Sequence, residues 1–274
     1  VIDLLVEHTP AVRFEPGARW EYSNTGYMLL ATIVSRASKM PFEDFLGRHV
    51  FEPAGMTDTV VYGYVPGVDE SMPNRVFGFR RGLGGEAIST DVHFLNHAQG
   101  DGGIYSTLDD LAKWDRVLYT DELVSRETLE EAFTPAELPS GDSTGYGFGW
   151  NIEPSPSGKK VVAHAGWWAG FSTYIYRAIE EDRCMILLSN DSARYFGEIV
   201  RGLIQLVHGQ PAELPRLSMA EHVGRLVLTE GVDRALEEYA RLKSDRSDDF
   251  VFAEGEFNNL GYRLLWEEHI EEAV

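Results

Sequence analysis

The chain has 274 residues, of which 43% are hydrophobic, so it is long enough to bury a full core and does not have the composition of a disordered protein. Its formal net charge of −20 argues against binding to a nucleic-acid backbone or an anionic membrane surface. No apolar run reaches the length of a membrane-spanning helix, and the single cysteine, Cys184, excludes an intrachain disulfide.

The first predicted elements are two helices that follow a Pro-Gly turn at 16–17. Apolar residues at helical spacing over 27–37 predict a helix that begins near Asn24, and Asn24 could serve as its N-cap. A second helix is predicted to begin at Pro41, because proline is favoured in the first turn of a helix. The stretch 63–103 is rich in Gly, Pro, Asn and Asp, which predicts irregular connections.

The middle of the chain predicts a sheet between two helices. A capping box at 107–110 starts the first helix, and apolar residues at helical spacing predict the second helix at 195–207. Between them, four strands are expected at TGYGFGW, KKVVAH, FSTYIYR and RCMILLSN, the last two as antiparallel neighbours. This order of elements predicts an α+β layer.

The character of the sequence changes after Pro215. A capping box at 218–221 and helices around 232–243 and 256–273 are predicted, and the last segment resembles an incomplete tetratricopeptide-type hairpin. The predicted domains are therefore 1–210, which holds the sheet, and a helical tail at 211–274. Such a tail could dock a protein partner.

Five segments resemble the serine β-lactamase-related family, which includes class C β-lactamases, penicillin-binding carboxypeptidases, esterases and D-aminopeptidases. The segments are FEPGARWEYSNTGYMLLATIVSRAS, PFEDFLGRHVFEPAGMTDT, GDGGIYSTLDDLAKW, GYGFGW and HAGWWAGFSTYIY, in that order. The resemblance implies an α+β fold in which an antiparallel sheet is flanked by helices and joined by a helical lobe, here with a helical C-terminal extension. It also implies acyl transfer from a small ester, amide, β-lactam or D-amino-acid peptide.

The resemblance assigns roles to five residues. Tyr22 and Asn24 match the family's Tyr-x-Asn motif, so Tyr22 is expected to act as general base and Asn24 to hydrogen-bond the substrate. His164 begins a His-x-Gly motif and is expected to face the substrate carboxylate or the tyrosine. Gly166 would leave room for substrate backbone, and the amide of Trp167 would be one arm of an oxyanion hole.

The family's nucleophile, the serine of a Ser-x-x-Lys motif, is not found at its expected place. None of the 21 residues before Tyr22 is a serine, and only Ser157 to Lys160 fits the motif formally, in a predicted hairpin turn. The abrupt start favours an incomplete N-terminal portion over loss of the motif, so this chain alone is expected to be inactive.

Two interpretations of the whole chain remain open at this stage. It is either the larger part of a serine hydrolase acting on a small molecule or short peptide, or a non-catalytic relative that binds such a ligand. No organic cofactor is expected, and no metal is expected at His93 and His97, because neither has a glutamate beside it and both lie in a predicted loop. The sequence leaves the localisation open.

Overall fold

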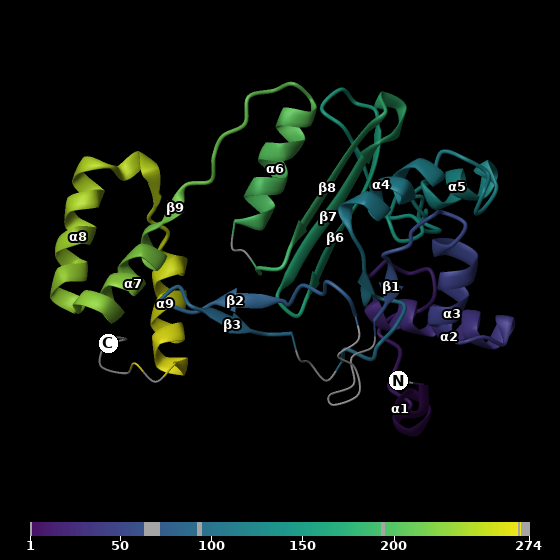
Figure 1. Cartoon of the computed structure of the whole chain (residues 1–274), viewed down its shortest axis with the longest axis horizontal. Coiled ribbons are helices and arrows are strands. Elements are labelled where there is room, and N and C mark those ends of the chain that lie inside the picture. Colours follow the sequence, from purple (N-terminus) through teal and green to yellow (C-terminus); the bar gives the residue numbers. More distant parts are fainter. Residues whose placement is uncertain (1, 63–71, 92–94, 193–194, 268, 270–274) are drawn as a thin grey trace. The chain divides into compact units, whose positions relative to one another are not determined.

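The computed structural model describes residues 2–62, 72–91, 95–192, 195–267 and 269, which form two compact units (Figure 1). Unit 1 comprises residues 1–76 and 92–189, and unit 2 comprises residues 77–91 and 190–274. The units follow spatial contacts, so they differ from the sequence boundary predicted at residue 210. That boundary rests on the change in sequence character after Pro215 and stays a prediction.

Unit 1 is built around a four-stranded antiparallel sheet in the order β5-β6-β7-β8. Helix α4 contacts β8, and α4 and α5 lie on one side of the sheet (Figure 1). The strands are β5 (Asn151–Pro154), β6 (Lys160–Trp168), β7 (Phe171–Ala178) and β8 (Arg183–Ser189), with a further pair β1 (Val60–Val61) and β4 (Ile104–Tyr105). The helices are α1 (Ile2–His8), α2 (Asn24–Ser38), α3 (Phe42–Leu46) with a π-helical continuation (Gly47–Phe51), α4 (Leu108–Val117), α5 (Arg126–Ala132) and a 3-10 turn (Ile179–Glu181).

The prediction for the first strand is wrong. The segment TGYGFGW forms a loop with one isolated bridge from Tyr146 to Asn151, and β5 begins only at Asn151. Its glycines explain the difference, because Gly145 and Gly149 have φ of +67° and +80°, outside the range of a regular strand. A Cβ at Gly147 would lie 2.2 Å from the carbonyl oxygen of Ala132, so this loop packs directly on the end of α5.

Helix α4 carries a buried carboxylate that the apolar pattern did not predict. Asp110 is fully buried and accepts hydrogen bonds from the backbone N–H of Asp58 at 2.7 Å and from the hydroxyl of Thr59 at 2.8 Å. Lys113 Nζ donates to it at 2.8 Å. These bonds fasten the loop before β1 to α4, which an apolar side chain could not do.

The described part of unit 2 combines a short hairpin with helices α6 to α9. The hairpin falls in a stretch predicted to be irregular, and residues 63–71 and 92–94 of that stretch, including His93, lie outside the described residues. A shared core joins Leu83 of the hairpin to α7, α8 and α9. The elements are β2 (Phe79–Arg81), β3 (Ala87–Ser89), α6 (Phe196–Val207), β9 (Leu217–Ser218), α7 (Met219–Glu230), α8 (Val232–Asp245), a 3-10 turn (Ser247–Asp249), β10 (Phe250–Val251) and α9 (Glu254–Trp266).

The N-caps of the capping boxes predicted at 107–110 and 218–221 are confirmed, but the second box lacks its reciprocal bond, because the Ser218 N–H donates to the Tyr195 hydroxyl at 2.6 Å. The Thr107 hydroxyl accepts from the Asp110 N–H, and the Ser218 hydroxyl accepts from the Glu221 N–H, both at 3.2 Å. The predicted tetratricopeptide-like character of the tail stays a prediction, because its last residues lie outside the described part of the chain.

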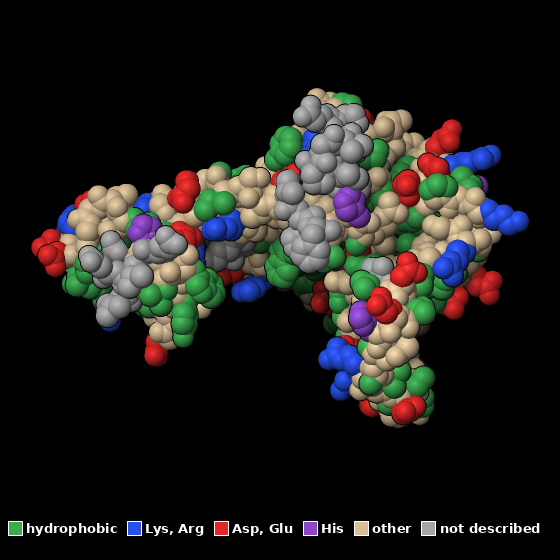
Figure 2. Space-filling view, turned by 90° about the horizontal axis from the view of Figure 1, so that it is seen from below, with side chains coloured by type: hydrophobic (Ala, Val, Ile, Leu, Met, Phe, Trp, Pro, Cys, Tyr) green, Lys and Arg blue, Asp and Glu red, His purple; other side chains and the backbone are tan. Residues whose placement is uncertain are grey.

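Charged side chains are distributed rather than segregated on the face shown in Figure 2, where acidic and basic groups are interspersed. Within the described part of the chain, no helix has both the length and the apolar character that crossing a bilayer requires.

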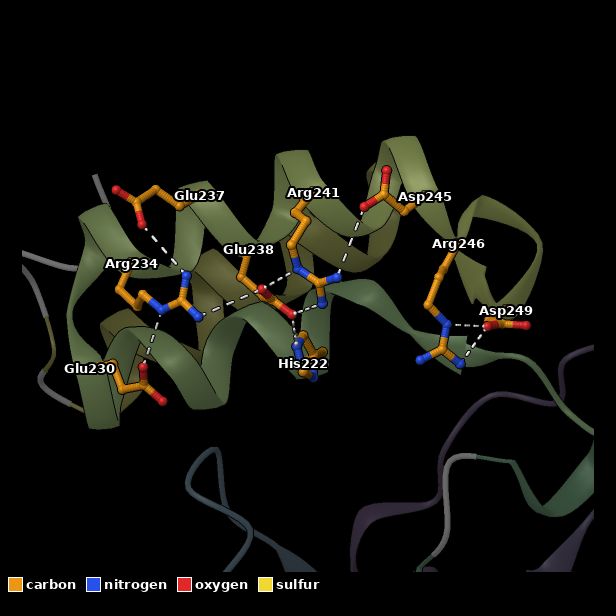
Figure 3. Close-up of polar contacts among 9 residues, drawn as sticks. All are labelled: His222, Glu230, Arg234, Glu237, Glu238, Arg241, Asp245, Arg246 and Asp249. Carbon is orange, nitrogen blue, oxygen red and sulfur yellow. Dashed lines mark hydrogen bonds and ion pairs between the residues drawn. The ribbon is translucent and has the colours of Figure 1, made fainter.

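An ion-pair network on α7 and α8 is centred on Glu238 (Figure 3). Arg241 donates two hydrogen bonds to its carboxylate, at 2.9 and 2.7 Å, and Arg234 and His222 lie 3.8 and 4.0 Å away. The Arg241 hydrogen bonds, helped by the charges of Arg241 and Arg234, lower the pKa of Glu238 below its usual value. The network therefore stabilises the ionised carboxylate.

We expect this network to make unit 2 sensitive to acid. A folded-state pKa below the unfolded value of about 4.3 gives stability that is present above that pH and is lost as the pH falls through the folded pKa. Glu238→Gln should lower the melting temperature at neutral pH, and its difference from the parent chain should shrink below about pH 4. Glu237→Gln, next in sequence but exposed and 3.5 Å from Arg234, is the matched control. A pH-independent Glu238→Gln difference would contradict this origin.

Candidate active site

Tyr22 lies immediately before α2, and the local sequence fixes where that helix begins. The hydroxyl of Ser23 accepts a hydrogen bond from the N–H of Gly26 at 3.0 Å, so Ser23 is the N-cap. The alternative that Asn24 caps the helix is wrong, because Asn24 is already its first residue. This leaves the Asn24 side chain exposed at the helix N-terminus.

Tyr22 and His164 come together although they are far apart in the sequence. Their ring centroids lie 6.2 Å apart with an interplanar angle of 34°. Tyr146 completes the contact, since its ring lies edge-on to Tyr22 at 6.0 Å and packs at 5.3 Å against Trp20. We call Trp20, Tyr22, Tyr146 and His164 the aromatic cluster, which joins the segment before α2, the loop before β5, and β6.

His164 uses both ring nitrogens within unit 1. Its Nε2 lies 2.9 Å from the hydroxyl of Tyr146, and its Nδ1 lies 2.6 Å from the carbonyl oxygen of Ala165. Strand pairing with Ile175 of β7 fixes its backbone. The imidazole is therefore held from the sheet and from the loop before β5.

The surroundings of Tyr22 act against ionisation of its phenol. Burial raises the pKa of Tyr22 above its usual value, and the charge of Asp101 and the nearby Tyr27 raise it further. Burial also raises the pKa of the Asp101 carboxyl. A general base near neutral pH needs a shift in the opposite direction, which a neighbouring cation would supply.

Asp101 is held beside α2 by tight backbone packing. Gly100 has φ of +104°, and a Cβ there would lie 2.5 Å from the carbonyl oxygen of Tyr27. Only glycine allows the 100–103 loop to approach the first turn of α2 so closely.

The remaining predicted residues lie on or near the same segments, but no hydrogen bond or ring-to-ring contact between described residues joins them to the rings of the cluster. Asn24 is at the head of α2, and Gly166 and Trp167 follow His164 on β6. Trp167 is 73% exposed, whereas Trp168 donates its indole N–H to Asn96 at 2.8 Å. The proposed roles of Asn24, Gly166 and Trp167 remain predictions.

Gly166 has a packing reason to be glycine besides the predicted one. It pairs with Thr173 across β6 and β7, and a Cβ at Gly166 would lie 2.5 Å from the Thr173 hydroxyl. We expect Gly166→Ala to lower the free energy of unfolding by about 1 kcal/mol through overpacking. Adding Thr173→Ala should restore most of that loss.

Urea unfolding of the two variants measures this coupling. If the double variant recovers stability but not ligand binding, the glycine serves both the sheet and the substrate. If Gly166→Ala alone costs no stability, the packing explanation is wrong.

Ser157 does not reproduce the arrangement that the family's nucleophile requires. It lies in the turn between β5 and β6, and its hydroxyl donates to Glu181, whereas Lys160 pairs with Glu130. Four residues of extended strand, roughly 13 Å, separate Lys160 from His164. The formal Ser-x-x-Lys match is therefore a surface turn.

Sequence reasoning missed Tyr146 and Asp101 as members of the site. Both stood within recognised segments, GYGFGW and GDGGIYSTLDDLAKW, and the glycines around them were a usable signal. Glycines on both sides of a single polar or aromatic residue indicate a chain path that only a close approach explains.

The chain is similar in sequence to a penicillin-binding protein and to D-aminopeptidases. Penicillin-binding protein 4* of Bacillus subtilis (strain 168) is 35% identical over 229 residues, which are 78% of this chain and 50% of that protein. A D-aminopeptidase of Brucella ovis is 23% identical over 188 residues, 68% of this chain and 34% of that enzyme. The chain thus spans half or less of the length of these relatives.

Solved structures confirm the predicted fold. The octameric penicillin-binding protein homologue from Pyrococcus abyssi has a TM-score of 0.62 at 27% identity and covers 79% of this chain and 48% of that chain. A D-amino acid amidase from Ochrobactrum anthropi SV3, complexed with L-phenylalanine amide, has a TM-score of 0.60 at 24% identity and covers 76% and 61% of the two chains. The model of the Beta-lactamase family matches residues 6–208, and the chain therefore belongs to that family.

Proposed function

We propose that this chain forms part of a serine hydrolase that transfers an acyl group from a small ester, amide, β-lactam or D-amino-acid peptide. Tyr22 is the general base that takes the proton of the nucleophilic serine. The serine and the lysine beside it come from a Ser-x-x-Lys segment other than Ser157 to Lys160, the one formal match within these 274 residues. The family's penicillin-binding and D-aminopeptidase members are consistent with this range of acyl donors.

The observation that carries the proposal is the meeting of Tyr22 and His164, whose ring centroids lie 6.2 Å apart. They match two separate motifs, one at the head of a helix and one on β6. An unrelated α+β protein has no reason to bring these two segments together. Their proximity is what a shared site for acyl transfer requires.

The raised pKa of Tyr22 is consistent with a general base that lacks its activating cation, which the Ser-x-x-Lys segment would supply. A free phenol with a pKa near 10 is a weak base at neutral pH, and burial and Asp101 make ionisation still less favourable here. A lysine ammonium within about 4–6 Å would favour the phenolate. The same segment would therefore bring both the nucleophile and the cation that activates Tyr22.

Substrate backbone can lie along the second half of β6. Strand β5 pairs with β6 only from Lys160 to Ala163, so among the described strands His164 to Trp168 pair with β7 alone. An extended substrate could pair with the other edge of β6 beside the aromatic cluster. Gly166 would allow its close approach, and the Trp167 amide would hydrogen-bond the developing oxyanion.

The electrostatics of Tyr22 also favour a second candidate, a non-catalytic ligand binder. If no lysine reaches Tyr22, its phenol stays protonated and can only hydrogen-bond a bound peptide or cell-wall-like ligand. The helical tail would then dock a partner. The coding sequence upstream of Val1 discriminates the two functions, because an in-frame Ser-x-x-Lys motif followed by a helix supports the enzyme.

The direct experiment is mass spectrometry after incubation with a penicillin. The 274-residue chain is expected to show no covalent adduct, whereas a chain extended through the upstream coding sequence should gain one adduct on the motif serine. Short-chain p-nitrophenyl esters test turnover in parallel. An adduct on Ser157 of the shorter chain would overturn the assignment, and an extended chain with neither adduct nor turnover would favour the binder.

A further inference from the structure

The hydrogen bonds of His164 determine which ring nitrogen carries its proton. The carbonyl oxygen of Ala165, 2.6 Å from Nδ1, can only accept, so the proton of that bond belongs to Nδ1. In a neutral imidazole Nε2 is then an acceptor, and the Tyr146 hydroxyl at 2.9 Å must be the donor. Both bonds agree on a single tautomer.

We propose that Tyr146 is a positioning residue, which donates its hydroxyl proton to Nε2 and so holds His164 in the Nδ1–H tautomer and in one ring plane. The tautomer stands on these two hydrogen bonds alone, whereas its use in acyl transfer rests on the proposed function. A neutral histidine is commonly oriented in this way by the partner of one of its two nitrogens.

Tyr146 is itself held rigidly. Its side chain is buried, and its ring packs against Trp20 at 5.3 Å and against the edge of Tyr22 at 6.0 Å. The tight contact of Gly147 with the carbonyl of Ala132 anchors the loop that carries it. Burial, with the neighbouring Tyr27 and Tyr22, raises the pKa of its phenol above the usual range, so the hydroxyl keeps its proton.

This arrangement changes the role expected of His164. With Nδ1 donating to Ala165 and Nε2 accepting from Tyr146, the neutral ring has no free donor for a substrate. It also offers no positive charge to a substrate carboxylate or to the phenol of Tyr22. Among the described residues, the groups outside the cluster that affect Tyr22 and Tyr146 are Tyr27 and Asp101, neither of which is a cation, so an activating cation for Tyr22 would come from another segment.

Nitrogen NMR of the full 274-residue chain tests the tautomer directly. Long-range proton–nitrogen correlations distinguish a protonated from an unprotonated ring nitrogen, and loss of one signal set in His164→Asn assigns the residue among eight histidines. At mildly alkaline pH we expect Nε2 unprotonated and Nδ1 protonated. We also expect a slowly exchanging Tyr146 hydroxyl proton with a nuclear Overhauser effect to the His164 ring.

Tyr146→Phe removes only the hydroxyl and keeps the ring. The Nε2 resonance of His164 should then move towards the protonated position, as the Nε2–H tautomer becomes populated. Tyr119→Phe is the matched control, because the Tyr119 hydroxyl is buried in unit 1 without a hydrogen-bond partner among the described residues. A protonated Nε2 in the parent chain, an absent hydroxyl contact, or unchanged His164 resonances in Tyr146→Phe would each overturn the proposal.

Discussion

Replacing Tyr22 by phenylalanine in a protein that carries this chain and the Ser-x-x-Lys segment is expected to slow acylation by roughly 10²- to 10⁴-fold. This is the range that a positioned general base contributes. Folding should be unaffected, because the Tyr22 side chain is 47% exposed and no hydrogen bond of its hydroxyl joins it to the other described residues. The rate of formation of the acyl-enzyme, followed with a chromogenic β-lactam or a p-nitrophenyl ester, measures the effect.

Tyr262→Phe is the matched control for this experiment. Tyr262 lies on α9 and is similarly exposed, so its hydroxyl should be dispensable for acylation. Acylation that is equally fast in Tyr22→Phe and Tyr262→Phe would rule out Tyr22 as the base. If Tyr22→Phe instead raises the substrate KM and leaves the maximal acylation rate unchanged, Tyr22 serves substrate binding and not proton transfer.

Replacing Arg177 by methionine is expected to lower the free energy of unfolding by about 3–5 kcal/mol, the cost of leaving a buried charge without its partner. The side chains of Arg177 and Asp115 are 0% and 6% exposed, and the guanidinium donates to the carboxylate at 2.6 Å and to the Asp115 carbonyl at 3.1 Å. The guanidinium also lies over the rings of Tyr119 and Phe133. This ion pair links α4 to β7, and urea unfolding measures its loss.

The neighbouring pair of Arg116 and Asp182 provides the control. These side chains are 70% and 73% exposed and lie 3.1 Å apart, so Arg116→Met should cost only about 0–1 kcal/mol. Adding Asp115→Leu to Arg177→Met should recover much of the stability, because the unpaired charge is removed. If Arg177→Met costs no more than Arg116→Met, the buried pair does not hold α4 to the sheet.

The elements that the sequence predicted best are those with a strong periodic pattern. Strands β6, β7 and β8 and helices α2, α4 and α6 appear close to their predicted places, since apolar spacing is a local signal. The predicted start of β5 was wrong. Tyr146 and Trp150 are residue types that favour strands, but the glycines beside and between them impose a loop. Helix α2 begins at Asn24 as predicted, but its N-cap is Ser23 instead of Asn24, because the Ser23 hydroxyl accepts the capping hydrogen bond.

From the sequence, the site could be predicted only for the residues that lie in recognised motifs. The Tyr-x-Asn and His-x-Gly segments identified Tyr22 and His164, and the structure brings their rings together. The hydrogen bond between Tyr146 and His164 depends on a loop path and on the sheet register, so no local pattern contains it. Likewise, the burial of Asp110 and of the pair between Asp115 and Arg177 depends on partners far away in sequence.

The most direct test of the account is a crystal structure of the N-terminally extended protein acylated by a penicillin. The account predicts that the acylated serine Oγ lies within hydrogen-bond reach of the Tyr22 hydroxyl, about 2.6–3.2 Å, with the motif lysine beside the same phenol. It also predicts that the ligand lies along β6 next to His164. An acylated serine remote from Tyr22, or a ligand bound away from β6, would contradict it.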